Sequence, residues 1–357
     1  RMSGDHVQPG PRIALIQGDI SPMRRMTDQQ ARKILDQYSR LSIDAMKEYP
    51  DLIVWPETMY PNSLTFWETA KGKPMSALGD PKKFNAADDL RVMAKYLGSP
   101  MIIGAGTQVK TPDSRRGYNS AVLVDPSEGI VGRYDKVHRV MFGEYVPLAE
   151  YFPWISRRLP VSGIVSGDPN QEPLRFKGYS GAVNICFEST VPHLIRGQAQ
   201  RLHDSGEKLD VLINLSNDGW FDGSSALDMH LACGVFRAIE CRKPMVIAAN
   251  TGFSAWIDAD GRVRWQGKRN AQDYFVAPVE LDSRESPYVR WGDWPAAMCN
   301  AACWFLALAI GFDWLRRRAS RESTPTDDPS MDGQLKKNDQ PTDETPTGDQ
   351  PTPSESS

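Results

Sequence analysis

A cysteine stands at the end of a short strand-like run, residues 181–189. In an extended chain successive side chains point to opposite faces, so the apolar residues of this run share one face while Asn184, Cys186 and Glu188 share the other. A thiol beside a carboxylate acts as a covalent nucleophile when a base removes its proton and a cation receives the charge of the intermediate. Free cysteine is also among the most buried residue types, so a packing role for Cys186 is the alternative.

Two further groups follow other strand patterns. Glu57 comes directly after the apolar run 52–55, and Lys136 follows a predicted hairpin over 120–134. Acyl transfer from an amide or ester needs a carboxylate to take the thiol proton, a thiolate to attack, and a cation beside the developing oxyanion. Taken singly, Glu57 is interpreted as a turn carboxylate and Lys136 as half of a solvated ion pair. Together with Cys186 they predict a catalytic triad.

The chain around these groups alternates between strand and helix patterns. An apolar strand pattern over 12–20 is followed by a helical pattern that begins with a capping box at Thr27. In the second half, a helical pattern over 191–203 leads to a strand over 210–215, and another helical pattern over 226–242 follows. This order predicts an α/β layered domain with two strand-rich halves, each flanked by helices.

Composition excludes several classes of protein and site. The 357 residues carry a formal net charge of −3, without a basic field that would indicate nucleic-acid binding. The five cysteines form no CxxC pair and the five histidines do not cluster, so neither a disulfide scaffold nor a structural zinc site is expected.

An apolar segment follows the α/β region. Residues 296–312 contain no charged side chain, Trp294 precedes them, and three arginines at 316–318 follow them. These features predict a membrane span over 294–315, with a buried soluble helix as the alternative. The arginines predict that its C-terminal end is cytoplasmic. Residues 316–357 are acidic and rich in Pro and Thr, which predicts a disordered cytoplasmic tail.

The order Glu57, Lys136, Cys186 in an α/β chain of this length resembles the nitrilase, or carbon–nitrogen hydrolase, superfamily. From about residue 12 to 316 the chain is similar to the apolipoprotein N-acyltransferase family of the bacterial inner membrane. The motifs that carry this resemblance are QGDI at 17–20, WPET at 55–58, FGEYVP at 142–147, CFE at 186–188, SNDGWF at 216–221 and GDWP at 292–295.

The resemblance implies a nitrilase-like catalytic domain over 12–290, folded as a four-layer α-β-β-α sandwich and followed by one transmembrane helix and the disordered tail. The family carries several membrane helices before its catalytic domain. Residues 1–11 are therefore expected to be a linker from a missing upstream region. The expected location is the bacterial inner membrane, with the catalytic domain on the periplasmic side.

The resemblance also implies a ping-pong acyl transfer through a Cys186 thioester. Glu57 is the general base and Lys136 the cation beside the oxyanion. The acyl donor is a membrane phospholipid, and the acceptor is the N-terminal amine of a diacylglyceryl-cysteine apolipoprotein. No metal and no cofactor is required.

Three supporting residues receive roles in the same way. Glu144 orients the catalytic lysine or assists proton transfer, while Phe187 and Glu188 shape the pocket wall. The carboxylate base leaves no catalytic task for the histidines at 138, 193 and 230, which are expected to be structural. The loop at 216–218 is expected to be held near the site by side-chain to backbone bonds.

Two other functions stay open. An amidase or nitrilase that hydrolyses a small amide or nitrile would use the same triad, but water as the acceptor needs no membrane span. A non-catalytic envelope scaffold would need no triad at all.

Overall fold

The computed structural model describes residues 6–21, 26–68, 74–75, 86–141, 143–145, 163–221 and 224–322. The chain divides into two compact units, Arg1–Asp293 and Trp294–Ser357. Each unit is described by itself.

The first unit contains an eight-stranded sheet in the order β14-β1-β2-β5-β3-β4, with β6 and β7 joined to β5. Its strands are β1 (Val7–Gln17), β2 (Leu52–Val54), β3 (Tyr60–Glu68), β4 (Pro74–Met75), β5 (Met101–Lys110), β6 (Arg115–Asp125), β7 (Gly129–Asp135) and β14 (Asp273–Asp282). The expected hairpin is confirmed, because β6 and β7 pair antiparallel.

A second sheet of six strands runs in the order β13-β12-β11-β10-β9-β8, with β9, β10 and β11 parallel. Its strands are β8 (Leu174–Phe176), β9 (Tyr179–Ile185), β10 (Val211–Ser216), β11 (Met245–Ala249), β12 (Ala255–Ile257) and β13 (Val263–Gln266).

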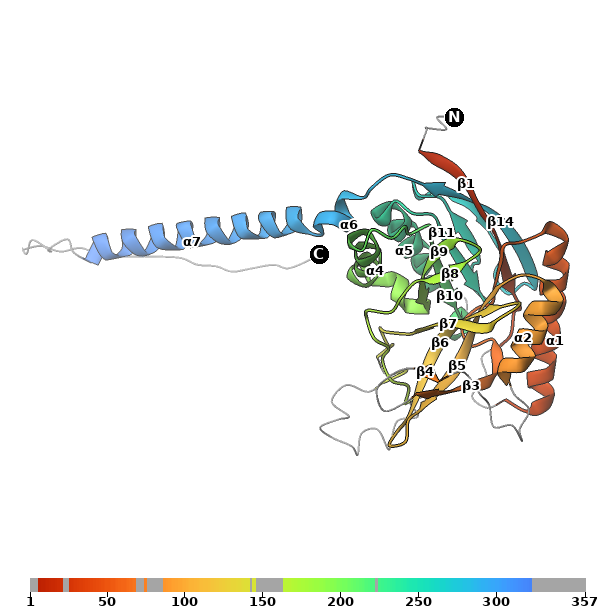
Figure 1. Ribbon diagram of the computed structural model, residues 1–357. Coiled ribbons are helices and arrows are strands. Elements are labelled where there is room, and N and C mark those ends of the chain that lie inside the picture. Colours follow the sequence, from red (N-terminus) through yellow and green to blue (C-terminus); the bar gives the residue numbers. More distant parts are fainter. Residues whose placement is uncertain are drawn as a thin grey trace, which may run out of the picture. The chain divides into compact units, whose positions relative to one another are not determined.

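Helices cover the outer face of each sheet (Figure 1). The first sheet is covered by α1 (Asp28–Ala45), which the short η1 (Met46–Glu48) extends, and by α2 (Ala86–Leu97). The second is covered by α4 (Pro192–Asp204) and α5 (Ala226–Cys241), with α6 (Pro287–Trp291) beside them. At the start of α1, Thr27 and Gln30 form the expected capping box.

Three apolar cores hold these layers together. Alternate residues of both sheets, such as Leu15 and Ile213, bury their side chains between the sheets. The opposite faces pack on the helices, with Ile53 under α1 and α2 and Leu212 under α4 and α5. The four-layer α-β-β-α sandwich expected from the sequence is therefore confirmed.

The N-terminal boundary differs from the expectation. Residues 7–11 were expected to lie in a linker, but they belong to β1, where Val7 pairs with Asp282 of β14. A register shift between Pro9 and Arg12 lets the strand continue past its two prolines. The linker expectation for 1–11 is thus wrong from residue 7 onward.

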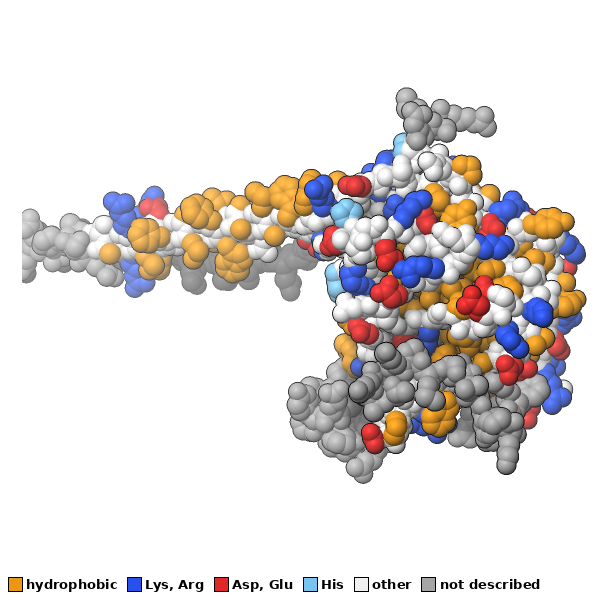
Figure 2. Space-filling view, viewed as in Figure 1, with side chains coloured by type: hydrophobic (Ala, Val, Ile, Leu, Met, Phe, Trp, Pro, Cys, Tyr) orange, Lys and Arg blue, Asp and Glu red, His pale blue; other side chains and the backbone are white. Residues whose placement is uncertain are grey.

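The second unit contains α7 (Trp294–Glu322). The segment Trp294–Ser320 is long and apolar enough to cross a membrane, with a mean hydropathy of 1.6 in an 18-residue window that has 0% of its residues buried. Apolar side chains run along α7, and arginines gather toward its C-terminal end (Figure 2).

The expectation that a disordered tail starts at residue 316 is wrong for its first residues, because α7 continues to Glu322. Arginine is a good helix former, and Arg317 pairs with Asp313 one turn earlier at 2.8 Å. Positive charge also suits the C-terminal end of a helix. The rest of the expected tail, 323–357, lies outside the described residues.

Candidate active site

Cys186 sits where β9 ends and the short helix η2 (Cys186–Thr190) begins. Its φ is 52°, a left-handed backbone conformation that costs a non-glycine residue about 1–3 kcal/mol. Such a conformation persists only where neighbouring groups determine it. Here the carbonyl oxygen of Cys186 accepts hydrogen bonds from Asn214 Nδ2 at 3.1 Å and from His230 Nε2 at 3.0 Å.

Glu57 lies in the turn after β2 with only 6% of its surface exposed. Its Oε1 accepts from Asn119 Nδ2 at 2.7 Å, and its Oε2 accepts from the backbone N–H of Asn217 at 3.1 Å. The turn passes directly over β5, where a Cβ at Gly104 would lie 2.6 Å from the Cα of Glu57. Only glycine leaves room for this approach.

Lys136 follows β7 and is 1% exposed. Its Nζ lies 3.1 Å from Glu57 Oε1 and 2.8 Å from Glu144 Oε1. Its backbone N–H donates to the carbonyl of Asn119 at 2.8 Å, which ties the lysine loop to β6. The structure thus brings the predicted site residues Glu57, Lys136 and Glu144 into one cluster around the buried lysine.

Glu144 has a second contact besides the lysine. Its Oε2 accepts from the backbone N–H of Val140 at 2.8 Å. One carboxylate oxygen is therefore anchored to its own loop and the other is directed at Lys136, which suits the orienting role expected of it. Phe142, in the same motif, lies outside the described residues.

Glu188 does not shape a pocket wall, because it is 0% exposed. Alternation along β9 would have put Glu188 on the same face as Cys186, but the chain turns into η2 at Cys186 and buries Glu188. Its Oε1 accepts from the backbone N–H groups of Val137 and His138 at 2.6 and 2.9 Å. Its Oε2 accepts from Ile185 N at 2.7 Å, so one carboxylate joins the lysine loop to the nucleophile strand.

Phe187 faces outward, with 41% of its surface exposed. Its ring stacks on that of His138, with 6.3 Å between ring centroids. Of the pair expected to line a wall, this residue alone has the exposure to meet a substrate.

A model of the carbon-nitrogen hydrolase family matches residues 12–286. The chain belongs to this family. The chain is similar to an apolipoprotein N-acyltransferase from Rhodopirellula baltica, with 30% identity covering 90% of this chain and 62% of the relative. It is similar to another from Geobacter metallireducens, with 33% identity covering 84% of this chain and 54% of the relative. The chain thus spans little more than half the length of these curated relatives.

The fold of this family member is also found in solved structures. The crystal structure of an amidase from Nesterenkonia sp. matches it with a TM-score of 0.51 and 17% identity, covering 81% of this chain and 96% of the amidase. At this identity the likeness concerns the fold alone.

The charges of the cluster act on one another. Burial by itself lowers the pKa of Lys136, but the charges of the Glu57 and Glu144 carboxylates and the hydrogen bond with Glu144, together with the nearby Cys186, outweigh burial, and the pKa is raised. Burial raises the pKa of the Cys186 thiol and Glu57 raises it further, while Lys136 lowers it. The resting site therefore holds a protonated thiol and a charged lysine, so attack by sulfur requires a base.

Sequence reasoning missed the groups that hold Glu57 in place. Asn119 lies within a strand pattern, and a single asparagine there carries no recognisable signal. Asn217 was expected to hold its loop through its side chain, whereas its backbone N–H makes the contact with Glu57. The side chain of Asn217 accepts from Asn250 Nδ2 at 3.0 Å, which is a side-chain to side-chain bond and not the side-chain to backbone bond expected of this loop.

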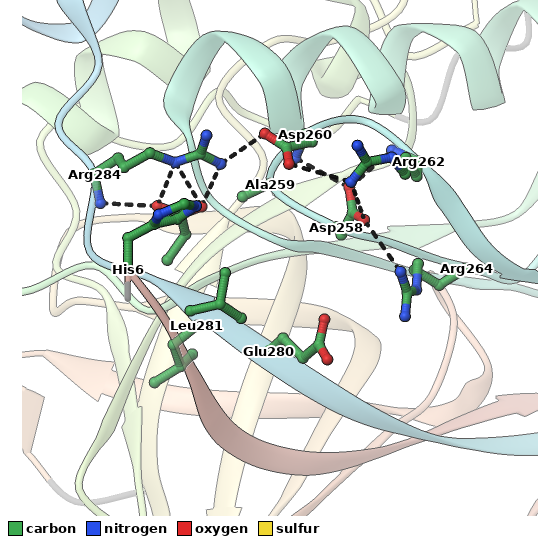
Figure 3. Close-up of a pocket in the computed structure, with 11 residues that line it drawn as sticks. His6, Asp258, Ala259, Asp260, Arg262, Arg264, Glu280, Leu281 and Arg284 are labelled. Atoms are coloured by element: carbon green, nitrogen blue, oxygen red, sulfur yellow. Dashed lines mark hydrogen bonds and ion pairs between the residues drawn. The ribbon is translucent and has the colours of Figure 1, made fainter. Parts of the chain in front are cut away.

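A separate cavity of about 720 Å³ lies beside the β12–β13 hairpin and the end of β14 (Figure 3). Each of its arginines has a carboxylate partner: Arg284 contacts Asp282 and Asp260, and Arg262 and Arg264 contact Asp258. The positive charge of this cavity is thus neutralised from within. Across the described part of the chain, no cluster of three or more His, Cys, Asp or Glu side chains could hold a metal ion.

Proposed function

We propose that this chain transfers a fatty acyl chain from a membrane phospholipid, through a Cys186 thioester, to the N-terminal amine of diacylglyceryl-cysteine apolipoproteins. The observation that carries the proposal is the buried contact of Lys136 with Glu57 beside the strained turn at Cys186. The names of the relatives and the apolar helix α7 support the lipid substrates.

In the first half-reaction Glu57 takes the thiol proton and the sulfur of Cys186 attacks the ester carbonyl of the phospholipid. The oxyanion that forms is stabilised by the charge of Lys136, which its carboxylate neighbours keep protonated. When the tetrahedral intermediate collapses, the carbon–oxygen bond breaks and the lysophospholipid alcohol leaves with the proton from Glu57. A thioester remains on the sulfur.

In the second half-reaction the amine of the apolipoprotein attacks the thioester carbonyl. Glu57 takes the proton that the nitrogen loses, an amide bond forms and the carbon–sulfur bond breaks. The thiolate recovers the proton, so the site returns to its resting state. Glu144 holds Lys136 in place through both halves.

We also propose that α7 spans the bacterial inner membrane. The arginines at 316–318 support a cytoplasmic C-terminal end and tail, and with them a catalytic unit on the periplasmic side. Both substrates are anchored in the bilayer. An enzyme confined to the same surface meets them at a raised effective concentration and does not have to extract them into water.

The test is the intact mass of the chain after incubation with phospholipid in detergent. The expected result is a gain of one fatty-acyl mass that hydroxylamine removes, and that Cys186→Ser lacks. Cys233→Ser is the matched control and should acylate normally, because Cys233 lies on α5 outside the cluster. Release of ammonia from small amides without an acyl adduct would overturn the proposal in favour of a hydrolase.

A further inference from the structure

We propose that His230 is a positioning residue: a buried imidazolium, held between Asp218 and the carbonyl oxygen of Cys186, that keeps the nucleophile in its left-handed conformation. The effect on acyl transfer rests on the function proposed above. The charge of the ring and its effect on the thiol do not.

The two contacts of His230 require two ring N–H groups. Nε2 lies 3.0 Å from the carbonyl oxygen of Cys186, and Nδ1 lies 3.2 Å from Asp218 Oδ1. A carbonyl and a carboxylate both accept hydrogen bonds, whereas a neutral imidazole has only one N–H to donate. With Asp218 ionised, both contacts are satisfied only by the doubly protonated, positively charged ring.

The surroundings favour that charge. His230 is 8% exposed and faces Asp218 of η3 (Asp218–Phe221), Glu57 of the turn after β2, and Cys186 of η2. Burial lowers the pKa of His230, but the hydrogen bond and charge of Asp218, with the charge of Glu57, outweigh burial and raise it.

Asp218 cannot turn away from the ring. Its Oδ1 accepts a hydrogen bond from the hydroxyl of Ser216, at the end of β10. On its other side a Cβ at Gly252 would lie 2.9 Å from the Asp218 Cγ. The absence of a side chain at Gly252 therefore lets the backbone there pack directly on the carboxylate. The acceptor that orients His230 is therefore itself fixed.

The hydrogen bond from His230 holds the backbone of Cys186, and the conformation of this backbone sets the direction of the thiol. The N–H of Ile185 is bound by Glu188 at 2.7 Å, and the carbonyl of Cys186 is bound by Asn214 and His230. The strained residue is thus clamped on both sides. Of these groups, His230 carries the positive charge, and once the ring loses a proton its one remaining N–H can serve only one of the two acceptors.

The first test measures the charge of the ring by NMR on the chain labelled with ¹⁵N-histidine. His230, assigned by loss of its signals in His230→Gln, should show two protonated ring nitrogens at pH 7.5. His203 is the comparison residue, since it pairs with Asp204 at 3.2 Å but is exposed. A neutral His230 at this pH would overturn the proposal.

The second test measures nucleophile positioning by the rate at which iodoacetamide alkylates Cys186. His230→Leu removes both hydrogen bonds and should slow alkylation by about 10²-fold, the size of effect expected when a reacting group is misplaced by an ångström. His230→Gln keeps an N–H donor and should recover part of the rate. In the wild type, deprotonation of His230 should make alkylation rise with pH less than ionisation of the thiol alone would. The His230→Gln variant should not show this reduction. His203→Gln should alkylate at the wild-type rate.

Thermal melting shows whether each variant is folded, and the comparison rests on His230→Gln if His230→Leu does not fold. Folded His230 variants with wild-type alkylation rates and pH profiles would overturn the proposal. For thioester formation, the expected change is a lower kcat with an unchanged KM. If the wild type forms no thioester while the NMR and alkylation results hold, the acyl-transfer proposal fails and the positioning role stands.

Discussion

Lys136 Nζ lies 3.1 Å from Glu57 Oε1, and the side chains of both residues are less than a tenth exposed. They are 79 positions apart in the chain and come from turns after different strands. A buried ion pair of this kind is weak evidence for stability, because desolvation offsets much of the attraction. Its value here is chemical, because it holds a carboxylate and a cation near enough to the Cys186 thiol to act on its pKa in opposite directions.

Removing one partner of this pair should be costly. Lys136→Met leaves the buried Glu57 and the partly buried Glu144 without their cation and should lower the free energy of unfolding by about 3–5 kcal/mol. Urea unfolding measures the change. Lys47→Met is the matched control, because Lys47 makes a 2.7 Å contact with Asp44 on the surface and should leave the unfolding curve unchanged. If both substitutions lowered the free energy of unfolding equally, the ion pair of Lys136 with Glu57 could not be buried as described.

The closeness of β5 to the Glu57 turn can be tested with two neighbouring glycines. In Gly104→Ala the new methyl group would lie 2.6 Å from Glu57 Cα, so the turn must shift. The expected loss of stability is about 1–3 kcal/mol, as for other overpacked sites, with slower thioester formation. Gly106→Ala, two residues along the same strand, meets only Ser63 Oγ at 3.7 Å and should be tolerated.

Glu188 should be a structural residue that depends on its two acceptor oxygens. In Glu188→Gln an amide NH₂ replaces one of two oxygens, and it meets backbone N–H groups that are themselves donors. The unsatisfied donors should lower the free energy of unfolding by about 1–3 kcal/mol. Glu172→Gln, at an exposed pair with Arg175, is the control. A Glu188→Gln variant as stable as the control would rule out this structural role.

The pH dependence of thiol reactivity should reveal the charges around Cys186. Because burial and Glu57 raise the pKa of the thiol, alkylation of the wild type should still be rising with pH above 9, past the ordinary thiol pKa of about 8.5. Glu57→Gln removes a negative charge and should shift the profile to lower pH. Lys136→Met removes a positive charge and should shift it to higher pH. Shifts in the opposite directions would contradict the arrangement of these groups.

The raised pKa of the Cys186 thiol also makes the free energy of unfolding depend on pH. A group with a folded pKa above its unfolded value stabilises the fold fully below the unfolded pKa, and this contribution is lost as the pH rises through the folded pKa. Cys186 should therefore stabilise the chain below about pH 8.5 and lose this effect above it. Cys186→Ser should show a smaller fall in the free energy of unfolding between pH 8 and 10 than the wild type.

Local patterns in the sequence determined the types of the elements and the choice of candidate reacting groups. Alternation and apolar runs identified β1 and β9, the capping box at Thr27 identified the start of α1, and the uncharged stretch before the arginines identified α7. The chemistry of a carboxylate, an amine and a thiol after separate strands identified Glu57, Lys136 and Cys186. These features depend on neighbours in the chain, which a sequence displays directly.

Only the tertiary structure decided how the groups face one another. The positive φ of Cys186 turned Glu188 away from the face that alternation gave it. Asn119, the backbone of Asn217 and His230 reached the site through contacts between residues 44 to 160 positions apart. Such contacts arise when two sheets and their helices pack together. The free energy that selects them comes from burying surfaces distant in sequence, which no local pattern records.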